Sequence, residues 1–233
     1  MISHNWWMHL LWVLVAGAIG FGITAVFAGW LKLKRAWLVL AYVLLAGAFL
    51  YAYFRWSQID LVEELRQRWL LGLAGAVVVG FLMVKNVQSQ PSSPRSEGGR
   101  LVFDILWFGI VYGVLDGVFL SVMPLLASGQ ALSELGWMGS WPGTVGAALV
   151  GLVASSYVTA AYHLGYPEFR GSAVAMPVLG NAIMSLGYIL TRNPLSAALS
   201  HAAMHVAAVW HGMEATIQLP PHYRNGLEDI DRV

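Results

Sequence analysis

The chain contains no cysteine among its 233 residues, and only 11% of its side chains are charged. Without cysteine there is no disulfide framework, no thiolate metal site and no cysteine nucleophile. A soluble domain usually carries about 25% charged residues, so this composition cannot cover a water-facing surface. The net charge of +1 argues against a nucleic-acid partner.

Apolar sequence takes the place of charge, since 58% of the residues are hydrophobic. Continuous apolar runs of about 20 residues recur, which is the length needed to cross a bilayer core of about 30 Å. Backbone groups in lipid must be paired within the chain, so runs of this kind form helices. We therefore expect an all-α, polytopic transmembrane bundle of about seven spanning helices, with eight as the alternative, whose surface contacts the lipid bilayer.

One polar stretch, rich in Gln, Ser, Pro, Gly and charged residues, divides the apolar runs and predicts a soluble linker. A second break, Ser128–Gly143, holds Gly, Pro and two Trp residues and predicts an interfacial loop. The expected parts are three helices in 1–85 with an interfacial helix near 55–68, the linker 86–100, a four-helix membrane core at 101–215 and a polar tail at 216–233.

Lysine and arginine in short loops predict the orientation of the helices, because cytoplasmic loops carry the excess of these residues. With the N-terminus outside, nine of the 13 basic residues are cytoplasmic: Lys32, Lys34, Arg35, Lys85, Arg95, Arg100, Arg170, Arg224 and Arg232. The other four are outside: Arg55, Arg66, Arg68 and Arg192. We expect a multi-pass protein of the plasma membrane with a cytoplasmic C-terminus.

Ionisable side chains inside spanning helices are costly, and they are functional candidates by default. The first three predicted helices offer only His9. The last four offer a larger set: Asp104, Asp116, His163, His201 and His205. We therefore expect the first three helices to serve packing and the C-terminal core to hold any site.

His201 and His205 are four residues apart and project from one face of a helix, one turn apart. They could be two metal ligands, a spacing known from helical zinc motifs. They could be a catalytic pair, or they could bond neighbouring helices and be structural. Asp116 lies midway along its helix and is a candidate base, whereas capping suffices for Asp104 near a helix end.

The segments around Asp116, His163 and His201 together resemble the CAAX-protease and bacteriocin-processing family of intramembrane proteases. The last family motif is a His followed four residues later by Asn, which is similar to His201 with His205 in the Asn position. The middle motif ends an aromatic-rich helix in a His, like His163, with Thr159 where the family has Phe. The first motif, a Glu pair followed by Phe and Arg, resembles Leu115–Leu120, which keeps one acid and the Phe.

The resemblance covers about Val102–His211 and implies an intramembrane peptidase, either divergent or inactive. By the resemblance, Asp116 would be the acid, His163 its partner in activating water, and His201 with His205 the pair that stabilises the oxyanion. A membrane-bound peptide would then be the substrate. The pair Glu63–Glu64 fits the acidic motif literally, but it lies in a charged surface segment far upstream of His163, so we interpret it as part of the interfacial helix.

Two other classes of function remain open from the residues. The chain could be a non-enzymatic membrane subunit that associates with other membrane proteins, which its eleven tryptophans and altered motifs favour. It could also bind a haem or a chlorophyll-type pigment through an intramembrane His. The sequence assigns no cofactor and no metal.

Overall fold

All regular structure in residues 5–212, the part that the computed structural model describes, is helical. The predicted tail at 216–233 and the predicted end of the last helix lie outside these residues. The helices are α1 (Trp6–Ile23, continued by π-helical Thr24–Trp30), α2 (Arg35–Ser57), α3 (Leu61–Arg66), α4 (Trp69–Gln88), α5 (Gly98–Asp104), α6 (Tyr112–Gly117), α7 (Met123–Glu134), α8 (Trp141–Leu164), α9 (Ala175–Thr191) and α10 (Leu195–His211). Short 3₁₀ turns precede α8 and α9: Trp137–Gly139, Pro167–Phe169 and Gly171–Val174.

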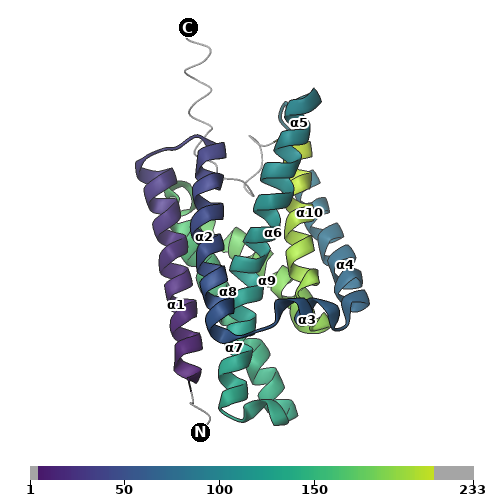
Figure 1. Cartoon of the computed structure of the whole chain (residues 1–233). Coiled ribbons are helices and arrows are strands. Elements are labelled where there is room, and N and C mark those ends of the chain that lie inside the picture. The colour runs from purple at the N-terminus through teal and green to yellow at the C-terminus, as the bar shows by residue number, and fades with distance from the viewer. Residues whose placement is uncertain (1–4, 213–233) are drawn as a thin grey trace.

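Six helical segments in the described part are long and apolar enough to cross a membrane. They are Trp6–Trp30, Arg35–Ser57, Trp69–Gln88, Gly98–Glu134, Trp141–Leu164 and Gly171–Thr191. The seventh predicted helix corresponds to α10, which is 17 residues long and packs against α4 and α6 (Figure 1). The prediction of an all-α polytopic bundle is confirmed, and the chain is a multi-pass membrane protein.

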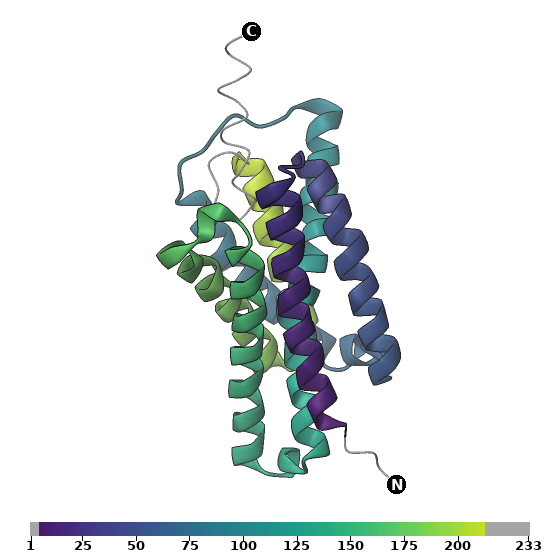
Figure 2. The same ribbon diagram turned by 90° about the vertical axis from the view of Figure 1, so that its left-hand side faces the viewer.

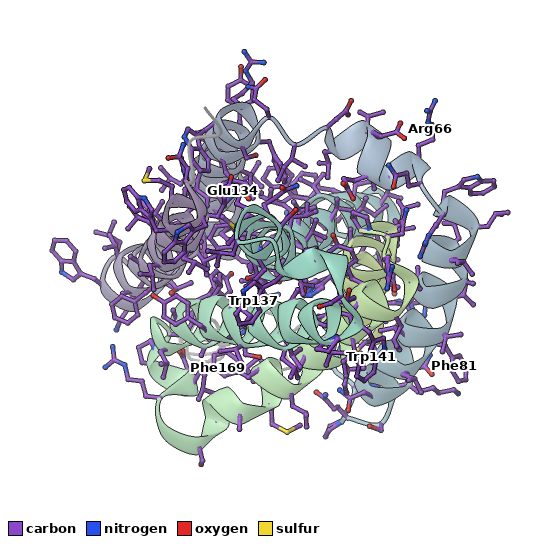
Figure 3. All side chains as sticks on the ribbon, turned by 90° about the horizontal axis from the view of Figure 1, so that it is seen from below. Arg66, Phe81, Glu134, Trp137, Trp141 and Phe169 are labelled. Carbon is purple, nitrogen blue, oxygen red and sulfur yellow. The ribbon has the colours of Figure 1, made fainter. Side chains whose placement is uncertain are left out.

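The outer surface of the bundle is apolar, as lipid contact requires. Phe81 on α4 is 60% exposed, and its ring points away from the helices in Figure 3. Trp137 and Trp141, at the end of the bundle seen in that view, are also exposed. Tryptophan favours the headgroup zone, so this end reaches the membrane interface.

One long helix, Gly98–Glu134, replaces the predicted helix and much of the predicted interfacial loop. Two π-helical stretches, Ile105–Val111 and Val118–Val122, join α5, α6 and α7 without a break. The prediction of a loop from Ser128 is wrong, because α7 continues to Glu134. The Ser128 hydroxyl is buried within this helix and donates to the carbonyl of Pro124 at 2.8 Å. A serine bonded to its own helix needs no loop.

The linker is shorter than predicted, because α4 continues to Gln88 and α5 begins at Gly98. The non-helical segment, residues 89–97, crosses one end of the bundle (Figure 2) and contacts the end of α10. The guanidinium of Arg95 lies 3.8 Å from the ring centre of Trp210. The backbone N–H of Ser93 donates to the carbonyl of His211 at 3.3 Å.

The interfacial helix near 55–68 is present as α3, which is shorter because α2 extends to Ser57. Asp60 caps its N-terminus by accepting from the backbone N–H groups of Val62 and Glu63 at 3.0 and 3.1 Å. Arg66 points outward in Figure 3 and pairs with Glu63 at 3.0 Å. A capped helix with an exposed ion pair fits the headgroup zone.

His9, the one ionisable residue predicted in the first three helices, joins α1 to its neighbours. Its Nδ1 lies 3.2 Å from the Tyr53 hydroxyl of α2, and its Nε2 lies 3.4 Å from the Glu134 carboxylate at the end of α7. Both contacts join α1 to other helices, and His9 does not line the cavity described below. His9 therefore serves packing, as expected.

The long helix and α10 pack with almost no side chain between them. Glycines at 109, 113 and 117 recur every four residues on the face of the long helix that meets α10. A Cβ atom on Gly113 would lie 2.8 Å from the Cα of Ala202, and one on Gly117 would lie 2.8 Å from the Cα of Ala198. Small residues at this spacing let backbones approach closely, which is how helices associate in lipid.

We expect the substitution Gly113→Ala to destabilise the protein, because the added methyl group overlaps the α10 backbone. The expected loss is about 1–3 kcal/mol, as for other overpacked sites. The measurement is thermal unfolding of the purified protein in detergent. Gly47→Ala on α2 is the matched control, since nothing lies within 4 Å of a Cβ there. Equal melting temperatures for the two variants would contradict the close contact.

Candidate functional site

A small cavity of about 60 Å³ lies between α4, α6, α8, α9 and α10. The four residues predicted from the sequence all line it: Asp116 from α6, His163 from α8, and His201 and His205 from α10. A polar cavity holds one water in roughly 10–15 Å³, so this volume has room for several. The cavity is far smaller than a haem or a chlorophyll, so it offers those cofactors no place.

The carboxylate of Asp116 is the centre of the polar contacts. Its Oδ2 atom lies 3.4 Å from Nε2 of His205 and 3.8 Å from Nδ1 of His201. All three side chains are buried. The close approach at Gly113 and Gly117 explains the geometry, because Asp116 sits on a helix whose backbone nearly touches that of the histidine-bearing helix.

Tyr42 on α2 holds the other carboxylate oxygen. Its hydroxyl donates to Oδ1 of Asp116 at 2.9 Å, and its ring is buried. The prediction that the first three helices serve packing alone is therefore wrong for α2. The sequence carried no signal for this role, since Tyr42 is one of many aromatic residues in an apolar run.

A hydrogen-bonded network holds His201 through its Nε2 atom, the ring nitrogen that does not face Asp116. Oδ1 of Asn181, on α9, lies 3.0 Å from Nε2 of His201 and accepts from the Ser121 hydroxyl at 2.7 Å. The Asn181 amide donates to Ser155 on α8 at 2.7 Å, and Ser155 donates to the carbonyl of Leu120 at 2.7 Å. An amide such as Asn181 within an apolar run is a signal that the sequence carries, whereas the serines gave none.

His163 is partly buried and makes its hydrogen bond within α8. Its Nδ1 lies 2.8 Å from the carbonyl oxygen of Thr159. Since a carbonyl only accepts, Nδ1 carries the proton and Nε2 keeps a lone pair. The resemblance makes His163 the partner of Asp116, but the polar contacts of that carboxylate in the described structure are with Tyr42 and the two histidines of α10.

A chain of tyrosine hydroxyls lies next to the cavity. The Tyr112 and Tyr162 hydroxyls are 2.6 Å apart, and Tyr162 and Tyr166 are 3.1 Å apart. Tyr112 also lines the cavity and places its ring edge-on to His205, with the ring centres 4.8 Å apart. These tyrosines were not predicted, because hydroxyl contacts between distant helices leave no sequence pattern.

Asp104 does not line the cavity. It lies at the end of α5, and capping near a helix end was expected to account for it. Its carboxylate accepts from Ser96 at 2.6 Å and from Arg100 at 3.1 Å. The acidic pair of α3 is also elsewhere, since Glu64 lines a different, open groove with Arg68 and Arg192. Burial raises the pKa of the Glu64 carboxyl, and the neighbouring Glu63 adds to the increase.

One group of residues in the described part could hold a metal ion. Asp116, His201 and His205 each offer one ligand atom, and these atoms lie within 4.8 Å of one another. Chemically, the cavity therefore combines a carboxylate, three imidazoles and several hydroxyls around a space for water. Such a set can activate water, bind a cation or transfer protons.

Comparison with known proteins gives no match: no family model, no curated protein and no solved structure matches the chain. The resemblance to the CAAX-protease family therefore stays a prediction from the motifs.

Because Asn181 on α9 connects the long helix Gly98–Glu134, α8 and α10 through buried groups, we expect Asn181→Ala to destabilise the bundle. Leaving the buried partners unsatisfied costs about 1–3 kcal/mol. The measurement is thermal unfolding in detergent. Asn86→Ala is the control, since Asn86 also lines the cavity but is exposed. A melting temperature unchanged by Asn181→Ala would contradict the network.

Proposed function

We propose that this chain is an intramembrane hydrolase of the peptidase type, resembling the CAAX-protease and bacteriocin-processing family. The observation that carries the proposal is the convergence of Asp116, His163, His201 and His205, from three helices, on one buried cavity with room for water. Ionisable groups inside a membrane protein are costly and are functional candidates by default, and four of them line this cavity.

In the proposed reaction His163 is the general base. Its Nδ1 proton is held by the Thr159 carbonyl, so the Nε2 lone pair is free to take a proton from water. The water oxygen then bonds to the peptide carbonyl carbon. The C–N bond breaks as the same proton passes from His163 to the leaving amine, which balances the hydrolysis.

The α10 histidines would stabilise the charge that develops on the carbonyl oxygen. His205 lies 3.4 Å from Asp116, a contact that orients its imidazole in the cavity. Such a group can donate to the oxyanion of the intermediate. Tyr42 and Asn181 would act as positioning residues, because each holds a member of this group by a hydrogen bond.

The proposed substrate is a membrane-bound peptide that approaches from the side of the bundle. The cavity lining includes exposed residues at the ends of two helices, Asn86 of α4 and Met176 of α9, the latter 53% exposed. An extended segment would enter between these two helix ends. Four methionines line the cavity, and flexible thioether side chains adapt to varied apolar ligands: Met83, Met176, Met184 and Met204.

The second candidate function is a non-enzymatic membrane subunit, and the cavity volume favours it. About 60 Å³ holds water but not a peptide, so hydrolysis requires α4 and α9 to separate. In a subunit without activity, the same polar network would hold the helices together. The two functions differ in whether the histidines affect turnover or only stability.

We expect Asp116→Asn and His163→Ala to lower peptide hydrolysis by about 10²- to 10⁴-fold, the usual contribution of an acid–base group. The assay follows cleavage of a panel of peptides anchored in phosphatidylcholine vesicles that contain the purified full chain. Asp104→Asn is the matched control, because that buried carboxylate belongs to a local ion pair outside the cavity. Cleavage by all variants at the same rate, or by none including the unaltered chain, would contradict the proposal.

We further propose a plasma-membrane location with the N-terminus outside. The basic loop between α1 and α2 lies at the same end of the bundle as the linker (Figures 1 and 2), so two basic segments share one side. Arg66, Arg68 and Arg192 belong to the α3 end. The positive-inside rule assigns the linker end to the cytoplasm.

Because the natural chain has no cysteine, single introduced cysteines test this orientation directly. We expect Met138→Cys, in the turn before α8, to react with a membrane-impermeant maleimide on intact cells. Ser92→Cys, in the linker, should react only after the cells are opened. Both positions are exposed. The reverse labelling pattern would show the opposite orientation.

A further inference from the structure

We infer that Asp116, His201 and His205 form a binding site for one divalent transition-metal ion that prefers nitrogen and oxygen ligands, such as Zn²⁺. The inference goes beyond the proposed hydrolysis and holds whether or not the chain cleaves peptides. It concerns three buried side chains from two helices whose ligand atoms lie within 4.8 Å of one another.

The distances from the carboxylate are close to those of a coordinated ion. Oδ2 of Asp116 lies 3.4 Å from Nε2 of His205 and 3.8 Å from Nδ1 of His201. Around a tetrahedral Zn²⁺ with bonds of about 2.0–2.1 Å, neighbouring ligand atoms lie about 3.4 Å apart. The three ligand atoms lie within 4.8 Å of one another, so binding one ion would draw the side chains together by up to about 1.4 Å.

The hydrogen-bond network fixes which nitrogen of His201 carries the proton. Ser155 uses its only proton on the carbonyl of Leu120, so it must accept from the Asn181 amide. That contact turns Oδ1 of Asn181 toward His201, and an amide oxygen only accepts. Nε2 of His201 is therefore the protonated nitrogen of the neutral ring, and Nδ1 presents a lone pair.

This lone pair faces a carboxylate oxygen, an arrangement that a cation between them would stabilise. Nδ1 of His201 is buried, makes no hydrogen bond in the described structure and lies 3.8 Å from Oδ2 of Asp116. Two electron-rich atoms facing each other in a low-dielectric interior repel, and a shared positive ion reverses the sign of that interaction.

Two of the three ligands, His201 and Asp116, have hydrogen-bond partners like those of known metal sites, whereas Nδ1 of His205 is buried without one in the described structure. A ligating histidine usually donates its second nitrogen to a carbonyl or carboxylate, as His201 does to Asn181. A ligating carboxylate is itself hydrogen-bonded, as Asp116 is by Tyr42, which occupies Oδ1 and leaves Oδ2 free. Three protein ligands beside a water-sized cavity leave one coordination position open, as in catalytic zinc sites.

The experiment measures metal bound to the purified full chain after incubation with Zn²⁺ and removal of excess ion. We expect about one Zn²⁺ per chain, as for a single tetrahedral site. Asp116→Asn and His201→Ala should each lose the bound ion. Co²⁺ should replace Zn²⁺ and give the visible absorption of tetrahedral coordination, and these bands should be absent from both variants.

Two further variants separate this inference from the proposed function and from loss of folding. Tyr42→Phe keeps all three ligands and should raise the Kd for Zn²⁺ by about 10- to 100-fold, the usual effect of removing a partner of a ligand. His163→Ala should bind Zn²⁺ normally while losing hydrolysis. Melting temperatures identify which variants remain folded.

The inference is overturned if the folded, unaltered chain retains no Zn²⁺ or Co²⁺. It is also overturned if Asp116→Asn, which preserves shape, retains the ion with unchanged affinity, or if binding depends on His211 at the end of α10 instead. Metal binding without cleavage of any peptide would support the inference and contradict the proposed hydrolysis. Cleavage of a peptide without bound metal would support the proposed hydrolysis and contradict the metal site.

Discussion

The near-contact between the backbones of α6 and α10 is the constraint on which the rest of the site depends. In lipid, helices gain little from burying apolar surface against each other, so close packing of small residues must hold them together. Gly113 and Gly117 provide that packing against Ala202 and Ala198. The same approach brings a carboxylate on one helix within 4 Å of two imidazoles on the other, so the contact that stabilises the pair also assembles the polar group.

A buried carboxylate has a free-energy cost that must be offset by its partners, and these come from both halves of the chain. Tyr42 of α2 donates to Asp116, while the histidines of α10 face its second oxygen. The N-terminal helices therefore take part in the site although they contribute no carboxylate and no imidazole to it. If Tyr42 or one of the histidines were removed, the Asp116 carboxylate would lose that partner in the interior. The stability of the N-terminal half is therefore linked to the chemistry of the C-terminal half.

The helical bundle and the ionisable residues that line the cavity could be predicted from the sequence, because both depend on the difference between apolar and charged residues in lipid. A run of 20 apolar residues has few alternatives to a spanning helix, and an aspartate or histidine within it stands out. The contribution of Tyr42 could not be predicted, since its role depends on which helix lies opposite. The length of the Gly98–Glu134 helix was not predicted for a similar reason. Ser128 is a polar residue that indicated the start of a loop, but its hydroxyl is bonded within the helix to the carbonyl of Pro124. Helix ends and tertiary hydrogen bonds are set by neighbours, not by local composition.

The contact between Asp116 and His205 connects the packing of the helices with what the cavity can bind. The short acid on one helix meets the long imidazole on the other at 3.4 Å, so the ring reaches a carboxylate that lies close to its own helix backbone. An amide at the position of His205 would be a poor metal ligand, whereas an imidazole is a common one. The side chain that contacts the buried acid is therefore also one that can bind a cation, so a change at either residue would alter both the contact between the helices and the chemistry of the cavity.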